Sequence, residues 1–239
     1  MKLLKISTLL LLPVLLSGQH FEIGAFAGVS NYLGDLSENS RKIYMQNTGF
    51  SGALFARYHI NHLAAARLML GYAGLSGSDA LSDNPAIRER NLSFSADLFE
   101  LSLTGEFNFP GYAPYNLERP FSPFLFAGVA VYYAEPTAGY AGIKYAATDK
   151  LNISLEAGAR MAFSDYLDDV GGTYMSYPEL LAGNGELAAA LGNRSGELLG
   201  GEPVTVPTGT PRGDNKTRDL YFMAGLSLSY NFLDNGLVG

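Results

Sequence analysis

The chain has 239 residues and no Cys, which excludes disulfide bonds and an N-terminal lipid-modified cysteine. Charged residues make up only 16% of it, against roughly a quarter in soluble domains, while Gly, Tyr and Phe are plentiful at 28, 15 and 14 residues. The net charge of −7 argues against a nucleic-acid partner, which would need a basic surface.

The N-terminus has the pattern of a secretory signal peptide. Lys2 and Lys5 precede an apolar run, Leu9–Leu16, and the small residues Ser17 and Gly18 follow it. This run is shorter than the roughly 20 residues that cross a bilayer as a helix, so cleavage is favoured over the alternative, an N-terminal membrane anchor. We therefore expect residues 1–18 to be removed and residues 19–239 to form one domain.

Apolar and polar residues alternate with a period of two through most of the mature chain, which is typical of β-strands. Beyond the signal peptide, no apolar stretch is long enough for a transmembrane helix. The alternation predicts strands at Phe21–Leu33, Phe50–Ile60, Ala64–Tyr72, Asn91–Phe109, Phe121–Tyr133, Gly139–Ala147, Leu151–Phe163 and Leu220–Phe232.

The fourth of these segments changes parity along its length. Its lower half places Phe99 and Leu101 on one face, whereas its upper half places Phe94 and Leu98 on the opposite face. Either a β-bulge lies near residues 97–99, or the upper half projects beyond the bilayer. We favour projection.

Eight antiparallel strands can close into a ring that leaves no edge in lipid. We therefore predict an all-β fold, an eight-stranded antiparallel transmembrane β-barrel of the bacterial outer membrane with a filled lumen. Connections after the odd-numbered strands fall at Gly34–Asn47, Leu75–Glu89, a brief Pro136–Ala138 and the long extracellular loop Ser164–Asp219. Long outer loops and short inner turns place both termini in the periplasm, with one long inner turn, Pro110–Pro120, as the exception.

The polar face of the strands carries four acids and four bases. They are Glu22, Arg57, Arg67, Glu100, Glu106, Lys144, Glu156 and Arg160. The interior of an eight-stranded barrel is just wide enough for side chains to fill it, so we expect these charges to form a paired network. A proton or ion path is the less favoured interpretation.

No catalytic or cofactor-binding motif is present, and we expect neither enzyme activity nor a cofactor. The three His residues fall at the predicted periplasmic end, away from an outer rim where a hydrolase would need a base. They are His20, His59 and His62. An acidic cluster in the outer loop is a weak candidate for Ca²⁺, although it lacks the spacing of an EF-hand and a solvated or capping role is favoured. Its residues are Asp165, Asp168 and Asp169.

Four segments carry a resemblance to a known family. They are FEIGAFAGVSNYLGDL (residues 21–36), RNLSF (90–94), SPFLFAG (122–128) and FSDYLDDVGGTY (163–174). Through them the mature chain resembles the PorG-type outer-membrane barrels of the type IX secretion system. That resemblance implies a barrel that sits over a periplasmic ring built from the lipoprotein PorK and the protein PorN.

We therefore expect a non-enzymatic anchor for a secretion or gliding-motility ring. Its partners would be outer-membrane lipid and the PorK-like and PorN-like proteins. The candidate periplasmic contacts lie in the long inner turn and are Tyr112, Tyr115, Glu118 and Arg119. The alternative is a surface-exposed adhesion or ligand-binding barrel that works through the outer loop.

Overall fold

The computed structural model describes residues 21–37, 43–112, 117, 120–131, 136–162, 167–168, 170, 172–200, 204, 206–213 and 218–232. The signal peptide expected at residues 1–18 lies outside these ranges and stays a prediction.

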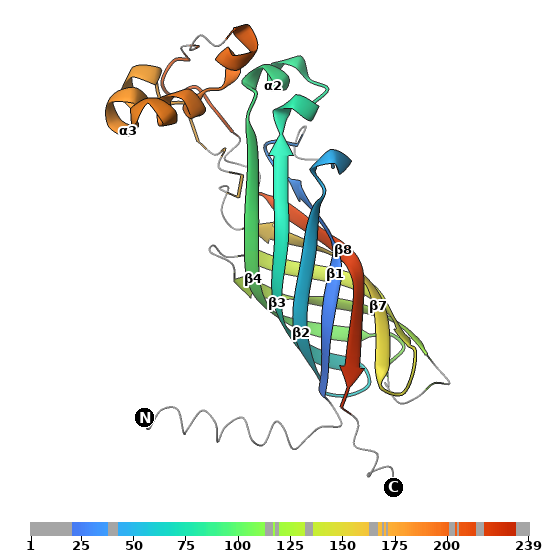
Figure 1. Cartoon of the computed structure of the whole chain (residues 1–239). Coiled ribbons are helices and arrows are strands. Elements are labelled where there is room, and N and C mark those ends of the chain that lie inside the picture. The colour runs from blue at the N-terminus through green and yellow to red at the C-terminus, as the bar shows by residue number, and fades with distance from the viewer. Residues whose placement is uncertain are drawn as a thin grey trace, which may run out of the picture.

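Eight antiparallel strands close into a ring, which confirms the predicted fold (Figure 1). The strands are β1 (Phe21–Leu33), β2 (Gly49–His59), β3 (Ala64–Ser78), β4 (Ser93–Asn108), β5 (Phe121–Val131), β6 (Pro136–Ala146), β7 (Leu151–Ala162) and β8 (Leu220–Asn231). Each strand pairs with the next, and β1 pairs with β8. β1 begins and β8 ends at the same end of the barrel, called here the terminal rim; the opposite end is the loop rim.

Two of the predicted loops are wrong in part. Residues 75–78 continue β3, because they pair with the upper part of β4. Residues 136–138 begin β6. Pro136 is accommodated there because a strand can start at a residue that has no N–H to donate.

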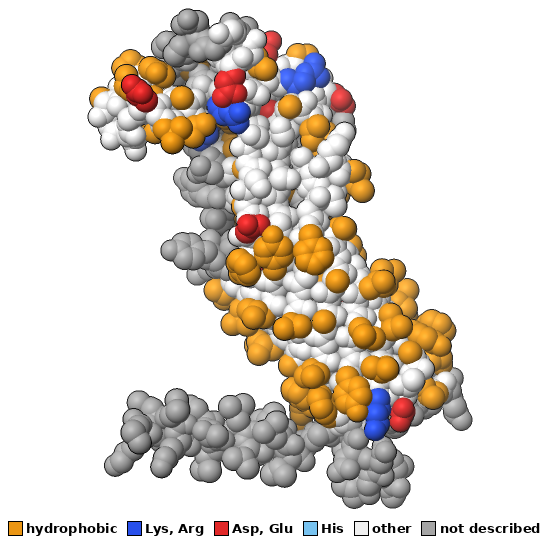
Figure 2. Space-filling view, viewed as in Figure 1, with side chains coloured by type: hydrophobic (Ala, Val, Ile, Leu, Met, Phe, Trp, Pro, Cys, Tyr) orange, Lys and Arg blue, Asp and Glu red, His pale blue; other side chains and the backbone are white. Residues whose placement is uncertain are grey.

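Outward side chains form an apolar belt around the barrel (Figure 2). Leu54, Leu70, Leu101 and Leu125 are between 49% and 66% exposed, and none of them has a polar neighbour on its own face two residues away along the strand. A continuous apolar band of this kind is stable where lipid covers it. The belt therefore marks the part of the barrel that lies in a membrane.

Aromatic side chains mark both margins of the belt. On the loop side, Tyr72 packs against Phe99, with ring centroids 5.3 Å apart. On the terminal side, Phe121 packs against Tyr145 at 4.7 Å. Girdles of this kind form at the two surfaces of a bilayer, where an aromatic ring has one apolar and one wet side.

The long β3–β4 hairpin rises above the belt. The two strands pair without interruption from Ala64↔Phe107 to Ser78↔Ser93, so the parity change in β4 comes from projection and not from a bulge. Above Phe99 the polarity of the two faces inverts. Ser95 and Asp97 point outward and are exposed, while Leu98 points inward and is only 7% exposed.

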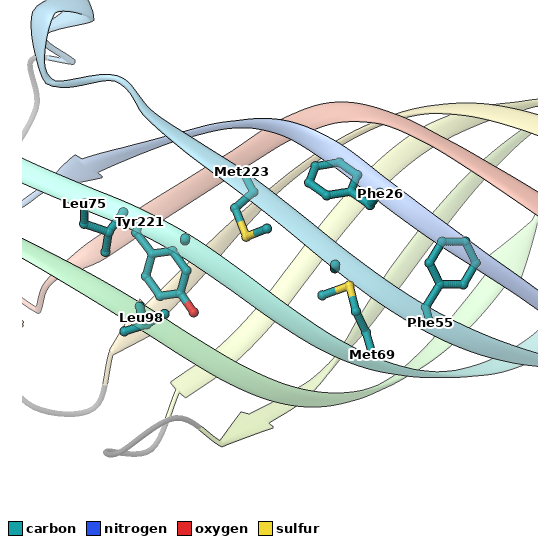
Figure 3. Packing of buried hydrophobic residues seen from close by; sticks show 9 residues of the cluster. Phe26, Phe55, Met69, Leu75, Leu98, Tyr221 and Met223 are labelled. Carbon is teal, nitrogen blue, oxygen red and sulfur yellow. The ribbon is translucent and has the colours of Figure 1, made fainter.

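A hydrophobic cluster runs inside the barrel from the level of the belt into the inverted part (Figure 3). Its larger members are Phe26, Phe55, Met69, Leu75, Leu98, Tyr221 and Met223. A second cluster lies nearer the loop rim and contains Tyr32, Leu36, Leu92 and Val170. Full burial of one such side chain stabilises a fold by about 1.5–3 kcal/mol. Above the membrane, the barrel is thus built like a soluble β-domain, with an apolar inside and a polar outside.

Short helices stand at the loop rim (Figure 1). They are η3 (Met45–Asn47), η4 (Asp79–Leu81), α2 (Pro85–Arg90), α3 (Tyr177–Gly192) and η5 (Ser195–Leu199). A capping box between Ser176 and Glu179 starts α3, and Gly185, at φ 85°, kinks it. Within the described residues, no helix combines the length and hydropathy needed to cross a membrane.

Candidate functional site

The lumen holds all eight charged residues that the alternation assigns to it. Each is at most 4% exposed, and each has an oppositely charged partner. An unpaired charge in such surroundings would cost several kcal/mol, so pairing is what permits these residues inside the wall. They form three groups along the barrel.

The group nearest the terminal rim joins two acids, two bases and an imidazole. Glu22 forms ion pairs with Arg57 and lies 2.9 Å from Nε2 of His59. Glu106 accepts from Lys144, and its other oxygen lies 2.9 Å from Nε of Arg57. Arg57 therefore bridges the two carboxylates, and His59 lies in this network.

The other two groups lie further toward the loop rim. Arg67 donates to Glu156 at 2.7 Å, and Ser227 donates to the second oxygen of that carboxylate at 2.5 Å. Arg160 makes a two-pronged contact with Glu100, at 2.7 and 2.8 Å. Bidentate pairs of this geometry are the strongest ion pairs that side chains make.

Aromatic rings occupy the space between the charges. The guanidinium of Arg67 lies 3.9 Å from the centre of the Phe55 ring, and the Lys144 ammonium lies 4.7 Å from that of Phe124. Such cation–π contacts offset part of the loss of hydration. A cavity beside Arg67 and Glu156 has a volume of only about 10 Å³, which is room for at most one water molecule. The described part of the lumen is therefore filled.

Two grooves on the outer wall are lined by apolar residues and glycine. One of about 470 Å³ is lined by residues such as Ile23, Leu54 and Leu68, and one of about 380 Å³ by residues such as Phe107 and Leu125. Both lie in the belt, and no titratable side chain lines them. They are surfaces for lipid.

The terminal rim is closed by Tyr112. Its backbone N–H donates to the carbonyl of His62 at 2.7 Å, which turns the chain back toward the lumen. Its hydroxyl donates to Oδ1 of Asn152, and its ring lies 4.8 Å from the Lys144 ammonium. Gly111 permits this path because its φ of +135° is rarely adopted by residues with a side chain.

This placement bears on the predicted partner contacts. Tyr112 is 2% exposed, so its side chain belongs to the lumen and offers no surface to a partner. Tyr115, Glu118 and Arg119 lie outside the described residues, and their role stays a prediction. No period-two pattern extends into this turn, so the sequence carried no signal for the inward path of Tyr112.

The loop rim is held together by Arg90. Its guanidinium makes two hydrogen bonds to the buried carboxylate of Asp79, at 2.7 and 2.8 Å. It also donates to the carbonyls of Asp35 and Arg212, at 2.9 and 2.8 Å. One side chain thus joins the β1–β2, β3–β4 and β7–β8 connections.

Asp168, a weak candidate for Ca²⁺, has a structural role. Its Oδ2 accepts from the Tyr32 hydroxyl at 2.5 Å and its Oδ1 from the Val170 N–H at 3.0 Å, while Asp219 lies 3.0 Å from the same hydroxyl. Burial raises the pKa of the Asp168 carboxyl, although these hydrogen bonds oppose the shift. Both carboxylate oxygens therefore accept hydrogen bonds from the protein, an arrangement called here the Asp168 cap.

The other sequence candidates give no metal centre. Asp165 and Asp169 lie outside the described residues. Among those that the structure describes, no three His, Cys, Asp or Glu side chains are grouped to hold a metal ion. His62 is exposed in the turn between β2 and β3, and His20 lies outside the described ranges.

Three solved structures match the chain at low similarity. They are Neisserial surface protein A (11% identity, TM-score 0.44, covering 88% of this chain and 96% of that one), the N-terminal β-barrel domain of Pseudomonas aeruginosa OprF (13%, 0.40, 89% and 96%) and the outer membrane protein OprG from Pseudomonas aeruginosa (9%, 0.40, 89% and 97%).

No curated protein matches the sequence. A family model does: residues 1–138, more than half of the chain, match the one described as "Domain of unknown function (DUF6089)". The chain belongs to this family.

Proposed function

We propose that this protein is a non-enzymatic anchor in the bacterial outer membrane, a PorG-like subunit of the type IX secretion system that holds a periplasmic ring of PorK-like and PorN-like proteins. The observation that carries the anchor is the filled lumen. Because paired charges and aromatic rings occupy the interior, the rims and the lipid-facing wall are the surfaces left for function. The secretion system itself is supported by the four sequence segments that resemble PorG-type barrels.

The proposed orientation places the terminal rim in the periplasm. Two connections at this rim are tight turns, between His59 and Ala64 and between Ala146 and Leu151. The loop rim carries the three longest connections, which follow β1, β3 and β7, and all five short helices that the structure describes. Outer-membrane barrels have short periplasmic turns and long outer loops, which favours this direction. The long turn between β4 and β5 then faces the ring.

A replacement of residues 113–119 by a Gly/Ser segment of equal length tests the anchor. This change spares Tyr112, so the lumen stays closed and only the part of the turn beyond it is altered. The tagged PorK-like lipoprotein should then recover much less barrel from detergent-solubilised membranes, and secretion should fall. Undiminished recovery of a correctly folded barrel would contradict the proposal.

A second candidate function, surface adhesion, is favoured by apolar side chains at the loop rim. Leu181, Leu187 and Leu191 of α3 are 40%, 73% and 51% exposed, far from the belt. Exposed apolar groups in such a place commonly contact a partner. Changing Leu187 and Leu191 to Ser discriminates the two functions: an adhesin would lose cell-surface binding, whereas the anchor would keep normal secretion.

A further inference from the structure

The upper part of β4 is paired on one side only, within the residues that the structure describes. β4 pairs with β3 up to its first residue, Ser93, but with β5 only up to Leu101, which lies opposite Val131. Because β6 begins at Pro136 and pairs back onto β5, their hairpin ends near this level. β3 and β4 rise above it (Figure 1). Residues Ser95–Phe99 therefore form a sheet edge above the belt, called here the free edge.

The odd-numbered residues of the free edge direct their backbone groups away from β3. In an antiparallel ladder, successive residues turn their N–H and C=O groups alternately toward the two neighbouring strands. Asn108 donates to the Leu63 carbonyl on the β3 side, whereas Phe109 donates to the Pro123 carbonyl on the β5 side. The β3–β4 register is continuous, so the residues that share the direction of Phe109 are Ser95, Asp97 and Phe99. Among the described residues, none pairs with their backbone on that side.

The inner face of the barrel is incompletely covered beside the free edge. Phe94 and Ala96 point inward but remain partly exposed, whereas Leu75 of the neighbouring β3 is only 2% exposed. On the outer face, Ser95 and Asp97 are exposed. An added strand would therefore cover apolar side chains with every second residue and meet polar side chains with the residues between.

We infer that the free edge binds an extended peptide segment of a partner protein, which adds to β4 as a further strand. Unpaired strand edges recognise peptides in this way, through main-chain hydrogen bonds and alternate side chains. The peptide has apolar residues toward the barrel interior and polar residues outside, with a Lys or Arg beside Asp97, the only charged residue of the edge. A second copy of the edge would bring no base to Asp97, so a different chain fits better.

The binding site lies at the rim opposite to the proposed ring contact. It goes beyond the proposed function and does not depend on it, because every residue that it uses belongs to β3 or β4.

The test is titration of the purified mature barrel, in non-ionic detergent, with a fluorescent peptide in which Val and Lys alternate. Ser95→Pro removes an N–H from the middle of the free edge, while the hydrogen bonds to β3 come from the even-numbered residues and remain. This variant should bind the peptide about tenfold more weakly or worse. Ser95→Thr, the matched control, keeps the N–H and should bind as the wild type does.

Backbone amide hydrogen exchange, measured by NMR, identifies the side of β4 that the peptide contacts. Without peptide, the N–H groups of Ser95 and Asp97 should exchange quickly and that of Ala96 slowly, since Ala96 faces β3. The peptide should slow exchange at Ser95 and Asp97 and leave Ala96 unchanged. Protection of Ala96 alone would overturn the inference.

Folding of each variant is checked by its heat-dependent gel mobility. If Ser95→Pro does not fold, Asp97→Lys takes its place and should shift the preference of the barrel from the Lys peptide to one in which Val and Glu alternate. Weaker binding by Ser95→Pro, or that shift, supports the inference. An unchanged affinity, an unchanged preference, or no binding of the Lys peptide to the wild type overturns it.

Two further outcomes would also overturn the inference. Equal binding of a peptide of the same composition in scrambled order would show charge attraction without strand pairing. Wild-type dimers that Ser95→Pro separates would show that a second copy occupies the free edge.

Discussion

Each ion pair inside the barrel mainly offsets the desolvation cost of its own two charges, and it adds little to the net free energy of folding. Taking Arg160 and Glu100 out of water costs several kcal/mol per ion, and the bidentate contact together with the Tyr221 hydroxyl, 2.5 Å from Oε2 of Glu100, offsets that cost. Removing one partner leaves the other charge buried without compensation for its lost hydration. A single substitution in the pair should therefore destabilise the fold strongly.

Glu100→Ala should lower the free energy of unfolding by about 3–5 kcal/mol, because it leaves the Arg160 charge without its acid. The matched variant, Glu100→Leu with Arg160→Met, removes both charges and should cost much less. Urea unfolding in lipid vesicles measures both. If the double variant is as unstable as the single one, the lumen pairs do not act by mutual compensation.

The Asp168 cap makes the packing of the outer loop depend on pH. Because burial raises the pKa of Asp168 in the folded protein, folding favours the protonated carboxyl. The protonated Asp168 carboxyl therefore adds to the stability of the folded protein below its ordinary pKa of about 3.9. This stabilisation is lost as the pH rises through the raised pKa of the folded protein. Protection of the Leu167 amide, which donates to Asp219 Oδ2 beside the shared Tyr32 hydroxyl, against hydrogen exchange should fall over this window. Asp168→Asn should flatten the dependence, and a variant that keeps the wild-type profile would contradict the assignment.

At the scale of elements, the β3–β4 hairpin carries two environments in one pair of strands. Its lower part has the lipid-facing pattern, and its upper part has the pattern of a soluble strand with Leu98 inside and Asp97 outside. Since the register is continuous, the change in polarity marks the surface of the membrane. This surface falls between Asp97 and Phe99.

Single cysteine substitutions can locate that boundary, because the natural chain has no Cys. Ser95→Cys and Asp97→Cys should react with a membrane-impermeant maleimide on intact cells. Leu101→Cys, in lipid, and Leu98→Cys, in the core, should not react. Equal labelling of Asp97→Cys and Leu101→Cys would place the belt elsewhere.

Much of the fold follows from period-two alternation, because each strand separates lipid from lumen and every second residue records that difference. The same parity assigns Glu22, Arg57 and Arg160 to the interior. The alternation gives no information about the segments that connect the strands. The inward path of Tyr112 depends on the backbone of Gly111 and on one hydrogen bond to His62, and the Arg90 contacts join three separate connections. Such long-range contacts have no local pattern in the sequence.

At the scale of the whole molecule, side chains fill the described interior of the barrel at three successive levels along its axis. Tyr112 and the Glu22–Arg57–Glu106 group close the terminal side, and the Arg67 and Arg160 pairs fill the middle together with the first apolar cluster. The second apolar cluster closes the loop side. We expect a barrel filled in this way to conduct no solute.

Steady conductance in planar lipid bilayers tests the filled lumen most directly. The folded wild-type barrel should insert and add no steady current above the baseline of the lipid. A stable ohmic conductance from the folded monomer would contradict the filled lumen, and with it the assignment of function to the rims.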